Sequence, residues 1–313
     1  MFRCNHFNML NVNHIRKRFG QLQALEDVSF NIRKGTCYGL LGPNGAGKST
    51  TIHSISGILA PDSGSILIDG TDLYSHTAAC KRKMGVVPQE IALYEDLSAW
   101  NNLLFWGSLY DMSKQDTLKR AAILLDWVGL ADRKNDLIAH YSGGMKRRIN
   151  IAAALMHDPD LILMDEPTVG IDPQSRNHIY TMLQDLRKEG KTILYTTHYM
   201  QEAEELCDEI GIIDNGQVIA SGTLEELRHQ HPIEESLHVH FSESVTTLTD
   251  LPWTHQWEQD HKKLIISSRQ THKDLAAVIQ FLDSRQISPE QIKFIPINLE
   301  TIFLHLTGRT LRD

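Results

Sequence analysis

The first third of the chain alternates short apolar runs with polar residues and turn signals. Leu25, Val28, Phe30 and Ile32 are interleaved with polar neighbours, a pattern typical of antiparallel strands with one buried face. Further short apolar runs predict strands at 37–41, 65–69 and 84–87, and the stretch 51–59 is suited to a helix. This part of the chain therefore predicts an antiparallel β region followed by α/β structure.

Strand character disappears over residues 98–157 and then returns. Within that stretch, apolar residues recur at the spacing of one helical face, namely Leu118, Ala121, Ala122, Leu125 and Val128. Strands are expected again at 161–164, 192–195 and 209–213, followed by an Asn215-Gly216 hairpin into 217–220. A capping box of Thr223 and Glu226 opens a helix. We expect an α/β sheet interrupted by a helical insert at about 90–157.

The pattern of apolar and polar residues changes again after about residue 230. Strands are expected at 237–241, 263–267 and 292–297, with helices at 273–284 and 298–306. These elements suffice for a small α/β unit of roughly 80 residues. The pattern thus divides the chain into a domain of residues 1–230 and an appendage of residues 231–313.

Composition limits the number of domains and the classes of partner but does not identify a function. The chain has 313 residues, of which 41% are hydrophobic, enough for one large domain and one small one. Its 31 basic and 39 acidic residues argue weakly against broad nucleic-acid binding, so no nucleic-acid partner is expected. No apolar run reaches the roughly 18 residues of a membrane span. Four scattered cysteines indicate reduced thiols rather than disulfides or metal ligands.

The most informative motif lies directly after the predicted strand 37–41. Residues 42–50 read Gly-Pro-Asn-Gly-Ala-Gly-Lys-Ser-Thr and fit the phosphate-loop pattern G-x-x-x-x-G-K-[ST]. Glycines let backbone N–H groups converge on phosphate oxygens, and a helix N-terminus adds partial positive charge. Lys48 can reach the β- and γ-phosphates of a nucleotide, and Ser49 can ligate Mg²⁺. The expected phosphate contacts are Gly42, Pro43, Asn44, Gly45, Ala46, Gly47, Lys48, Ser49 and Thr50.

A second motif supplies carboxylates. The apolar run 161–164 ends in Asp165 and Glu166, so a buried strand would deliver both beside the phosphate loop. Asp165 would hold Mg²⁺, and Glu166 would polarise an attacking water as general base. A hydrophobic strand ending in two acids is weak evidence alone, because a solvated strand end has the same pattern. Its pairing with the loop upstream favours the functional interpretation.

Five further segments resemble those of ABC-transporter ATPases, in the family's order, over about residues 9–230. Tyr141-Ser142-Gly143-Gly144-Met145 resembles the signature motif, and Gln89 matches the glutamine loop. Val169-Gly170-Ile171-Asp172 resembles the D-loop, His198 the switch histidine, and Phe19 the aromatic A-loop. The resemblance implies an α/β P-loop NTPase of ABC type, with an antiparallel β subdomain, a helical insert and a small C-terminal α/β appendage.

The resemblance also implies roles for these residues. Phe19 would stack on adenine, Gln89 would lie near Mg²⁺, and His198 would contact the γ-phosphate and Glu166. The signature helix would aim its dipole at the γ-phosphate bound to another copy, which implies a homodimer with two composite sites. The implied catalytic residues are Glu166, His198, Gln89 and Lys48; Tyr141, Ser142, Gly143, Gly144 and Asp172 join the ATP contacts; Ser49, Gln89 and Asp165 hold Mg²⁺.

This signature begins with Tyr141 and ends with Met145 where the family has Leu and Gln, and Val169-Gly170-Ile171 stands where Ser-Ala-Leu is commoner. The serine and both glycines are intact, so activity is expected to persist, although its rate could differ.

The end of the chain narrows the resemblance. Residues 298–309, Asn-Leu-Glu-Thr-Ile-Phe-Leu-His-Leu-Thr-Gly-Arg, are similar to the C-terminus of ATPases that serve type-2 ABC exporters of the daunorubicin-resistance group, and residues 93–103 are similar as well. Such ATPases work at the cytoplasmic face of the cell membrane, bound to a separate transmembrane permease whose coupling helix the helical insert cradles. The resemblance implies ATP hydrolysis coupled to export.

Two alternatives remain open from the sequence. A soluble ABC ATPase acting on ribosomes or DNA is the second function hypothesis, although the chain has neither a second phosphate loop nor a long coiled-coil insertion. His238 and His240 lie on one face of a predicted strand and could begin a metal site, but solvated histidines are the simpler interpretation because further ligands are not evident.

Overall fold

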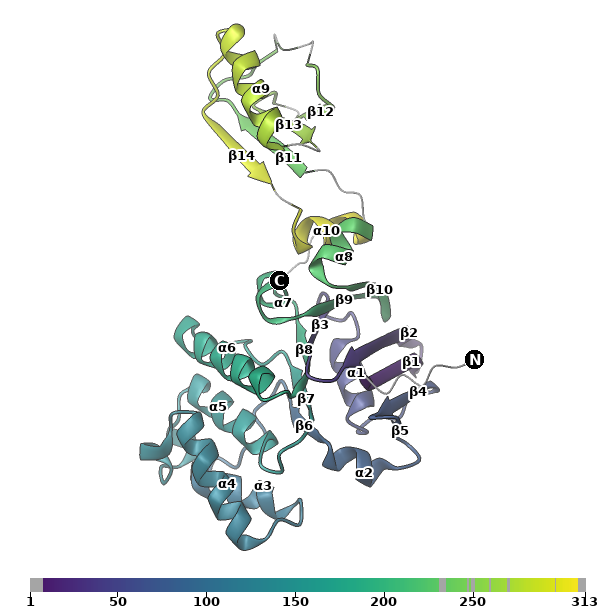
Figure 1. Ribbon diagram of the computed structural model, residues 1–313, viewed down its shortest axis with the longest axis vertical. Helices are drawn as coiled ribbons and strands as arrows, with labels where there is room; N and C mark the ends of the chain where they lie inside the picture. Colours follow the sequence, from purple (N-terminus) through teal and green to yellow (C-terminus); the bar gives the residue numbers. More distant parts are fainter. Residues whose placement is uncertain are drawn as a thin grey trace. The chain divides into compact units, whose positions relative to one another are not determined.

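The computed structural model describes residues 8–230, 235–246, 248, 251–258, 260–268, 271–295 and 297–308. The chain divides into two compact units, the first running to Leu224 and the second beginning at Glu225 (Figure 1). The sequence pattern places this boundary about six residues later, after residue 230, because the helix that the capping box opens belongs with the second unit.

The first unit is built on a sheet of ten described strands in the order β5-β4-β1-β2-β10-β9-β3-β8-β7-β6. One side is antiparallel, with β1 pairing to both β2 and β4, as the alternating pattern predicts. The other side is parallel through β9, β3, β8, β7 and β6. The strands are β1 (Asn8–Phe19), β2 (Leu22–Arg33), β3 (Cys37–Leu41), β4 (Ser63–Ile68), β5 (Thr71–Asp72), β6 (Met84–Val87), β7 (Leu161–Asp165), β8 (Thr192–Thr197), β9 (Glu209–Asp214) and β10 (Gln217–Gly222).

The topology gathers the chemistry at one edge of the sheet. The phosphate loop follows β3, Asp165 ends β7, and β8 lies between these two strands. Because parallel strands place their carboxyl ends together, the loop and the two acids meet there. Helix α1 (Lys48–Ile55) begins at the loop lysine itself, three residues before the helix that the sequence predicts.

Helices cover the parallel part of the sheet. The insert contains α3 (Ala99–Ser108), α4 (Lys114–Trp127) and α5 (Gly143–Ala154), which confirms the predicted helical stretch. Three helices have no counterpart in the sequence prediction: α2 (Thr77–Arg82), α6 (Pro173–Lys188) and α7 (Met200–Leu206). Ser98, Ser113, Ser142 and Asp172 each cap a helix by accepting a backbone N–H, so four helix starts are encoded locally.

The second unit is a four-stranded sheet in the order β12-β13-β11-β14, packed against α9 (Thr271–Ser284). Its strands are β11 (Glu235–His240), β12 (His255–Trp257), β13 (Lys263–Ser268) and β14 (Gln291–Ile295), of which β12 is not predicted. The unit also holds α8 (Leu224–Gln230) and α10 (Leu299–Thr307). Leu299, Ile302 and Phe303 of α10 are fully buried, whereas Leu306 is half-buried and Leu304 is exposed.

A membrane span and a metal-ion site each require particular features of the described residues. No described helix is both long enough and apolar enough to span a bilayer. No cluster of three or more His, Cys, Asp or Glu side chains that could hold a metal ion occurs among the described residues.

Candidate functional site: a nucleotide pocket at the phosphate loop

The phosphate loop borders an open pocket of about 360 Å³, a size in the usual range for small-molecule sites. Glycine is required at two loop positions. A Cβ at Gly42 would lie 2.2 Å from the carbonyl oxygen of Ile213, and Gly47 adopts φ +107°, a left-handed conformation. The described residues that line the pocket are Phe19, Leu22, Gln23, Ala24, Asn44, Gly45, Gly47, Lys48, Ser49, Thr50, Gln89 and Glu166.

Lys48 is buried at the centre of this site. Its Nζ donates to the carbonyl oxygens of Gly42 at 2.8 Å and Pro43 at 3.0 Å. It also lies 3.0 Å from Glu166 Oε1, and both side chains are almost wholly buried, with exposures of 4% and 6%. The loop lysine and the candidate base are therefore an ion pair, shielded from solvent, where electrostatic interactions are weakly screened.

Asp165 and Glu166 are held by Thr196 of the neighbouring strand β8. The Thr196 hydroxyl donates to Asp165 Oδ1 at 2.7 Å and accepts the Glu166 backbone N–H at 3.0 Å. Glu166 has φ +44°, in the left-handed region that a side chain rarely adopts. Such strain occurs where surrounding contacts over-determine the backbone, and here it accompanies a carboxylate that reaches Lys48.

His198 completes this group from the end of β8. Its Nδ1 lies 3.3 Å from Glu166 Oε2, although the two atoms are not aligned for a hydrogen bond, and Nδ1 is buried without another partner. The imidazole packs against the ring of Tyr199, with 4.1 Å between ring centroids. One carboxylate thus contacts Lys48 through one oxygen and approaches His198 with the other.

Phe19 and Gln89 both line the pocket. Phe19 ends β1, its ring is 48% exposed, and Lys17 Nζ lies 5.9 Å from its centroid. An exposed aromatic face beside a phosphate loop is suited to stacking on a base. Gln89 follows β6 and is also exposed. Its backbone carbonyl accepts from Arg147 of α5 at 2.5 Å, and Arg147 also donates to the Pro88 carbonyl at 2.8 Å.

The signature residues lie apart from this pocket: among the residues the structure describes, none of residues 141–145 lines it, and neither does Asp172. Ser142 and Gly143 are exposed at the start of α5, where the Ser142 hydroxyl accepts the Met145 N–H at 3.3 Å. Asp172 caps α6 by accepting the Ser175 N–H at 2.9 Å, a bond that lowers the pKa of its carboxyl. A Cβ at Gly144 would lie 1.9 Å from Ser175 Oγ, so the first turns of α5 and α6 touch closely.

Tyr141 is expected from the sequence among the nucleotide contacts. In the structure its side chain is buried and its hydroxyl donates to the Arg133 carbonyl at 2.7 Å. The Tyr141 ring packs in the core of the helical insert, and burial raises the pKa of its hydroxyl.

The donors at the pocket suit magnesium. Mg²⁺ prefers hard oxygen ligands, usually one or two carboxylates completed by phosphate oxygens and water. Ser49 and Gln89 line the pocket with a hydroxyl and an amide, and Asp165 offers a carboxylate at the end of β7. This set contains no soft ligand and leaves most positions to phosphate and water, which is the pattern of a nucleotide-bound magnesium ion.

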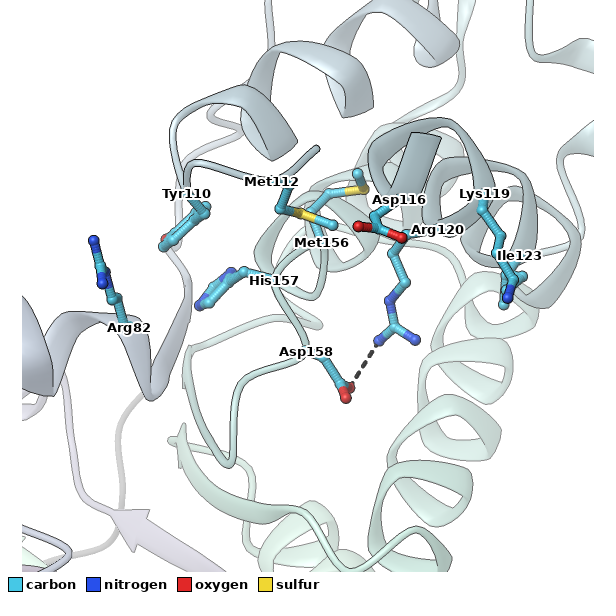
Figure 2. A pocket seen from close by; sticks show the side chains of 10 residues that line it. All are labelled: Arg82, Tyr110, Met112, Asp116, Lys119, Arg120, Ile123, Met156, His157 and Asp158. Atoms are coloured by element: carbon cyan, nitrogen blue, oxygen red, sulfur yellow. Dashed lines mark hydrogen bonds and ion pairs between the residues drawn. The ribbon is translucent and has the colours of Figure 1, made fainter. Parts of the chain in front are cut away.

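Two further hollows lie on the helical insert. The smaller, of about 190 Å³, is mostly apolar and is lined by Ile58, Val86, Pro88, Ala92, Trp106, Tyr110, Asn150, Ala153 and Ala154. The larger, of about 410 Å³, shares Tyr110 with it (Figure 2). There Tyr110 stacks on His157 at 3.5 Å, and Arg120 pairs with Asp158 at 3.0 Å. Neither hollow contains a residue of the phosphate loop.

Three buried residues whose hydrogen bonds hold the segments of the site in place were not identified from the sequence. Thr196, Arg147 and Glu202 are all buried and polar. Thr196 and Arg147 contact Asp165 and Pro88, far away along the chain, and Glu202 joins residues of β8 and α6. A polar residue in the sequence does not by itself identify such a partner.

A phosphate loop, a strand-end carboxylate pair and a nearby histidine on this sheet define a P-loop nucleotide hydrolase. Residues 25–169 match the family described as ABC transporter. The chain is 45% identical to the linearmycin resistance ATP-binding protein LnrL of Bacillus subtilis, over 97% of this chain and 100% of that protein. It is 37% identical to a Nod factor export ATP-binding protein I of Ralstonia nicotianae, over 97% of this chain and 95% of that protein.

The daunorubicin group is represented too, by the resistance ATP-binding protein DrrA3 of Streptomyces coeruleorubidus, 33% identical over 96% of each chain. Among solved structures, a cassette described as a dimeric post-hydrolysis state bound to ADP and Pi matches with a TM-score of 0.63 and 29% identity, over 69% of this chain and 98% of that one.

The chain belongs to the ABC transporter ATP-binding family. It is an ATP-binding and ATP-hydrolysing subunit of an ABC exporter, as the sequence predicts, and the relatives favour this role over action on ribosomes or DNA.

Proposed function

We propose that this chain works as a homodimer with two composite ATP sites, in which the phosphate loop of one copy faces the signature helix of the other. The observation that carries the proposal is the separation within one chain: the pocket holds Lys48 and Glu166, whereas Ser142 and Gly143 are exposed elsewhere. A second copy can bring an exposed helix N-terminus to the phosphates, where backbone N–H groups and the helix dipole favour negative charge. An isologous arrangement makes two equivalent sites.

Within each site, we assign the chemistry to Glu166. ATP phosphates offer Lys48 stronger partners than the Gly42 and Pro43 carbonyls it now contacts, so binding draws Lys48 away from Glu166. The freed carboxylate takes a proton from a water that attacks the γ-phosphorus, and the bond to the β-phosphate oxygen breaks. His198 stays beside Glu166 and the γ-phosphate, and Phe19 stacks on the base.

Ser49, Gln89 and Asp165 would hold Mg²⁺, which when bound neutralises phosphate charge and orients the leaving group. Asp165 is fixed for this task by the Thr196 hydroxyl.

We further propose that a separate transmembrane permease docks in the apolar hollow beside Gln89, which would place the chain at the cytoplasmic face of the membrane. Trp106 Nε1 and Asn150 Nδ2 in this hollow are buried without hydrogen-bond partners. A docked helix that presents acceptors would satisfy both. Arg147 on the signature helix holds the Gln89 segment, so movement of the docked helix is transmitted to the site.

The dimer proposal is tested with mixed dimers of two inactive variants. Ser142→Arg blocks the signature helix by bulk, and Lys48→Ala disables the phosphate loop. In a mixed dimer one composite site carries both lesions and the other carries neither, so partial ATPase activity should return. If verified mixed dimers remain inactive, the sites are not composite.

A further inference from the structure

The helix that follows the switch histidine carries a buried acid that the proposed chemistry does not use. Glu202 of α7 is 2% exposed, and its carboxylate accepts three hydroxyl hydrogen bonds. Tyr180 donates to Oε1 at 3.1 Å, and Tyr195 and Thr197 donate to Oε2 at 2.9 and 2.8 Å. Burying a carboxylate is costly, and the one described cation near Glu202, Arg176, reaches it only at 3.9 Å, so three hydroxyls supply its hydrogen bonds.

The three donors come from the elements that surround the catalytic group. Thr197 directly precedes His198, and its hydroxyl also accepts the backbone N–H of Tyr199 at 2.9 Å. The two residues that flank His198 are therefore fixed by one hydroxyl, which Glu202 orients. The Tyr199 ring in turn packs on the His198 imidazole.

The network also reaches the D-loop. The Tyr195 hydroxyl lies 3.3 Å from the Thr168 hydroxyl, two residues beyond Glu166, and Tyr180 belongs to α6, which Asp172 caps. Burial raises the pKa of both tyrosines, with Glu202 adding to the effect, so their hydroxyls stay protonated and donate. Arg176 of α6 stands nearby, with Nε 3.9 Å from Glu202 and its guanidinium 5.5 Å from the Tyr199 ring.

We infer that Glu202 is a positioning residue. It holds His198 close to Glu166 and connects the segment around His198 to α6, the helix that follows the D-loop. The Glu202 carboxylate bonds to β8 through Tyr195, to Thr197 beside His198, and through Tyr180 to α6. Release of any one donor would let the His198 loop shift away from its 3.3 Å approach to Glu166. This inference rests on the proposed roles of His198 and Glu166.

A double-mutant cycle on the full-length chain tests it. Glu202→Gln retains the shape but replaces one acceptor oxygen by a donor, so kcat for ATP hydrolysis should fall roughly tenfold while ATP affinity stays within about twofold. In a His198→Ala background the same substitution should change kcat by less than about twofold, because the residue it positions is gone. Glu205→Gln, an exposed glutamate on the same helix, is the matched control and should be silent.

The outcomes separate the two hypotheses. If Glu202→Gln lowers kcat equally with and without His198, Glu202 does not act through the histidine and the inference is overturned. If His198→Ala itself leaves kcat unchanged, the proposed role of His198 fails first. Should Glu202→Gln not fold, Tyr180→Phe removes one donor from α6 with little change in packing; a fall in kcat that also requires His198 supports the inference, and an unchanged kcat contradicts it.

Discussion

At the scale of single residues, the site depends on a few buried polar side chains with several partners each. Lys48 joins the loop carbonyls to Glu166, and Thr196 joins Asp165 to the Glu166 backbone. Buried polar groups are costly when one partner is removed, because the remaining one cannot turn to water. Substitutions of these side chains should therefore lower both ATPase activity and the free energy of unfolding. The balance between the two losses depends on which hydrogen-bonding atom is removed.

Replacing Lys48 with alanine should weaken ATP binding by roughly 10- to 100-fold, because a charge-assisted contact to phosphate contributes about 1.5–3 kcal/mol. Titration with a fluorescent ATP analogue measures the affinity. Lys119→Ala, which removes a lysine from the larger hollow on the helical insert, is the control and should bind normally. Unchanged affinity of Lys48→Ala would remove this lysine from the site.

Replacing Thr196 with valine keeps the shape of the strand residue but deletes the hydroxyl that holds both acids. The Asp165 carboxylate would lose its hydroxyl donor, whereas the Glu166 N–H would keep the Thr196 carbonyl at 3.2 Å. Loss of the bond to the carboxylate should destabilise the fold by about 1–3 kcal/mol and lower kcat by at least about tenfold. Thr192→Val is the control, because Thr192 lies on the same strand and its hydroxyl accepts the Gly35 N–H far from the acids. Equal kcat losses in both variants would mean that Thr196 serves stability alone.

At the scale of elements, the first turns of α5 and α6 pack directly against each other. Gly144→Ala would place a Cβ 1.9 Å from Ser175 Oγ and 2.4 Å from Ser175 Cβ, so the two helix starts must separate. We expect ATP binding to persist, because the phosphate loop is elsewhere, and ATPase activity to fall.

The compensating variant Gly144→Ala with Ser175→Gly removes both clashing atoms and should recover part of that activity in the same ATPase assay. Ser175→Gly alone is the control. An active single Gly144→Ala variant would show that the close packing of the two helices does not matter to hydrolysis.

The sequence predicts elements well where a local signal is strong. The alternation of Leu25, Val28, Phe30 and Ile32 identifies β2, and the heptad-like spacing from Leu118 to Val128 identifies α4. Helix α6 is missed although Asp172 caps it and Pro173 begins it, both of which are helix-start signals. Strand β5 has two residues and carries no periodic pattern at all.

The site is predictable to the extent that its residues sit in contiguous motifs. Lys48, Asp165 and Glu166 can be predicted because Lys48 lies in a phosphate-loop motif and the two acids end an apolar strand. The roles of Thr196 and Glu202 cannot be predicted in this way. They depend on the strand order, in which β8 lies between β3 and β7, and on partners up to 31 residues away. A single sequence does not encode that adjacency in any local pattern.

At the scale of the whole molecule, each unit has its own core, and every nucleotide motif lies in the first. A chain truncated after Thr223, where β10 has ended, should therefore still bind ATP within about twofold of the full chain. Its dimer stability or coupling to a permease should suffer instead. A folded truncation that cannot bind ATP would show that the second unit supports the nucleotide site directly.

The central claim is that ATP joins two copies across sites that neither copy completes alone, and it is tested most directly by the mass of Glu166→Gln in solution. The amide keeps the shape of the side chain but cannot take a proton, so ATP should bind without turnover and hold the dimer closed. Light scattering should then give twice the 35.5 kDa mass of one chain with ATP, and the mass of a single chain with ADP. A mass of one chain at saturating ATP would contradict the account.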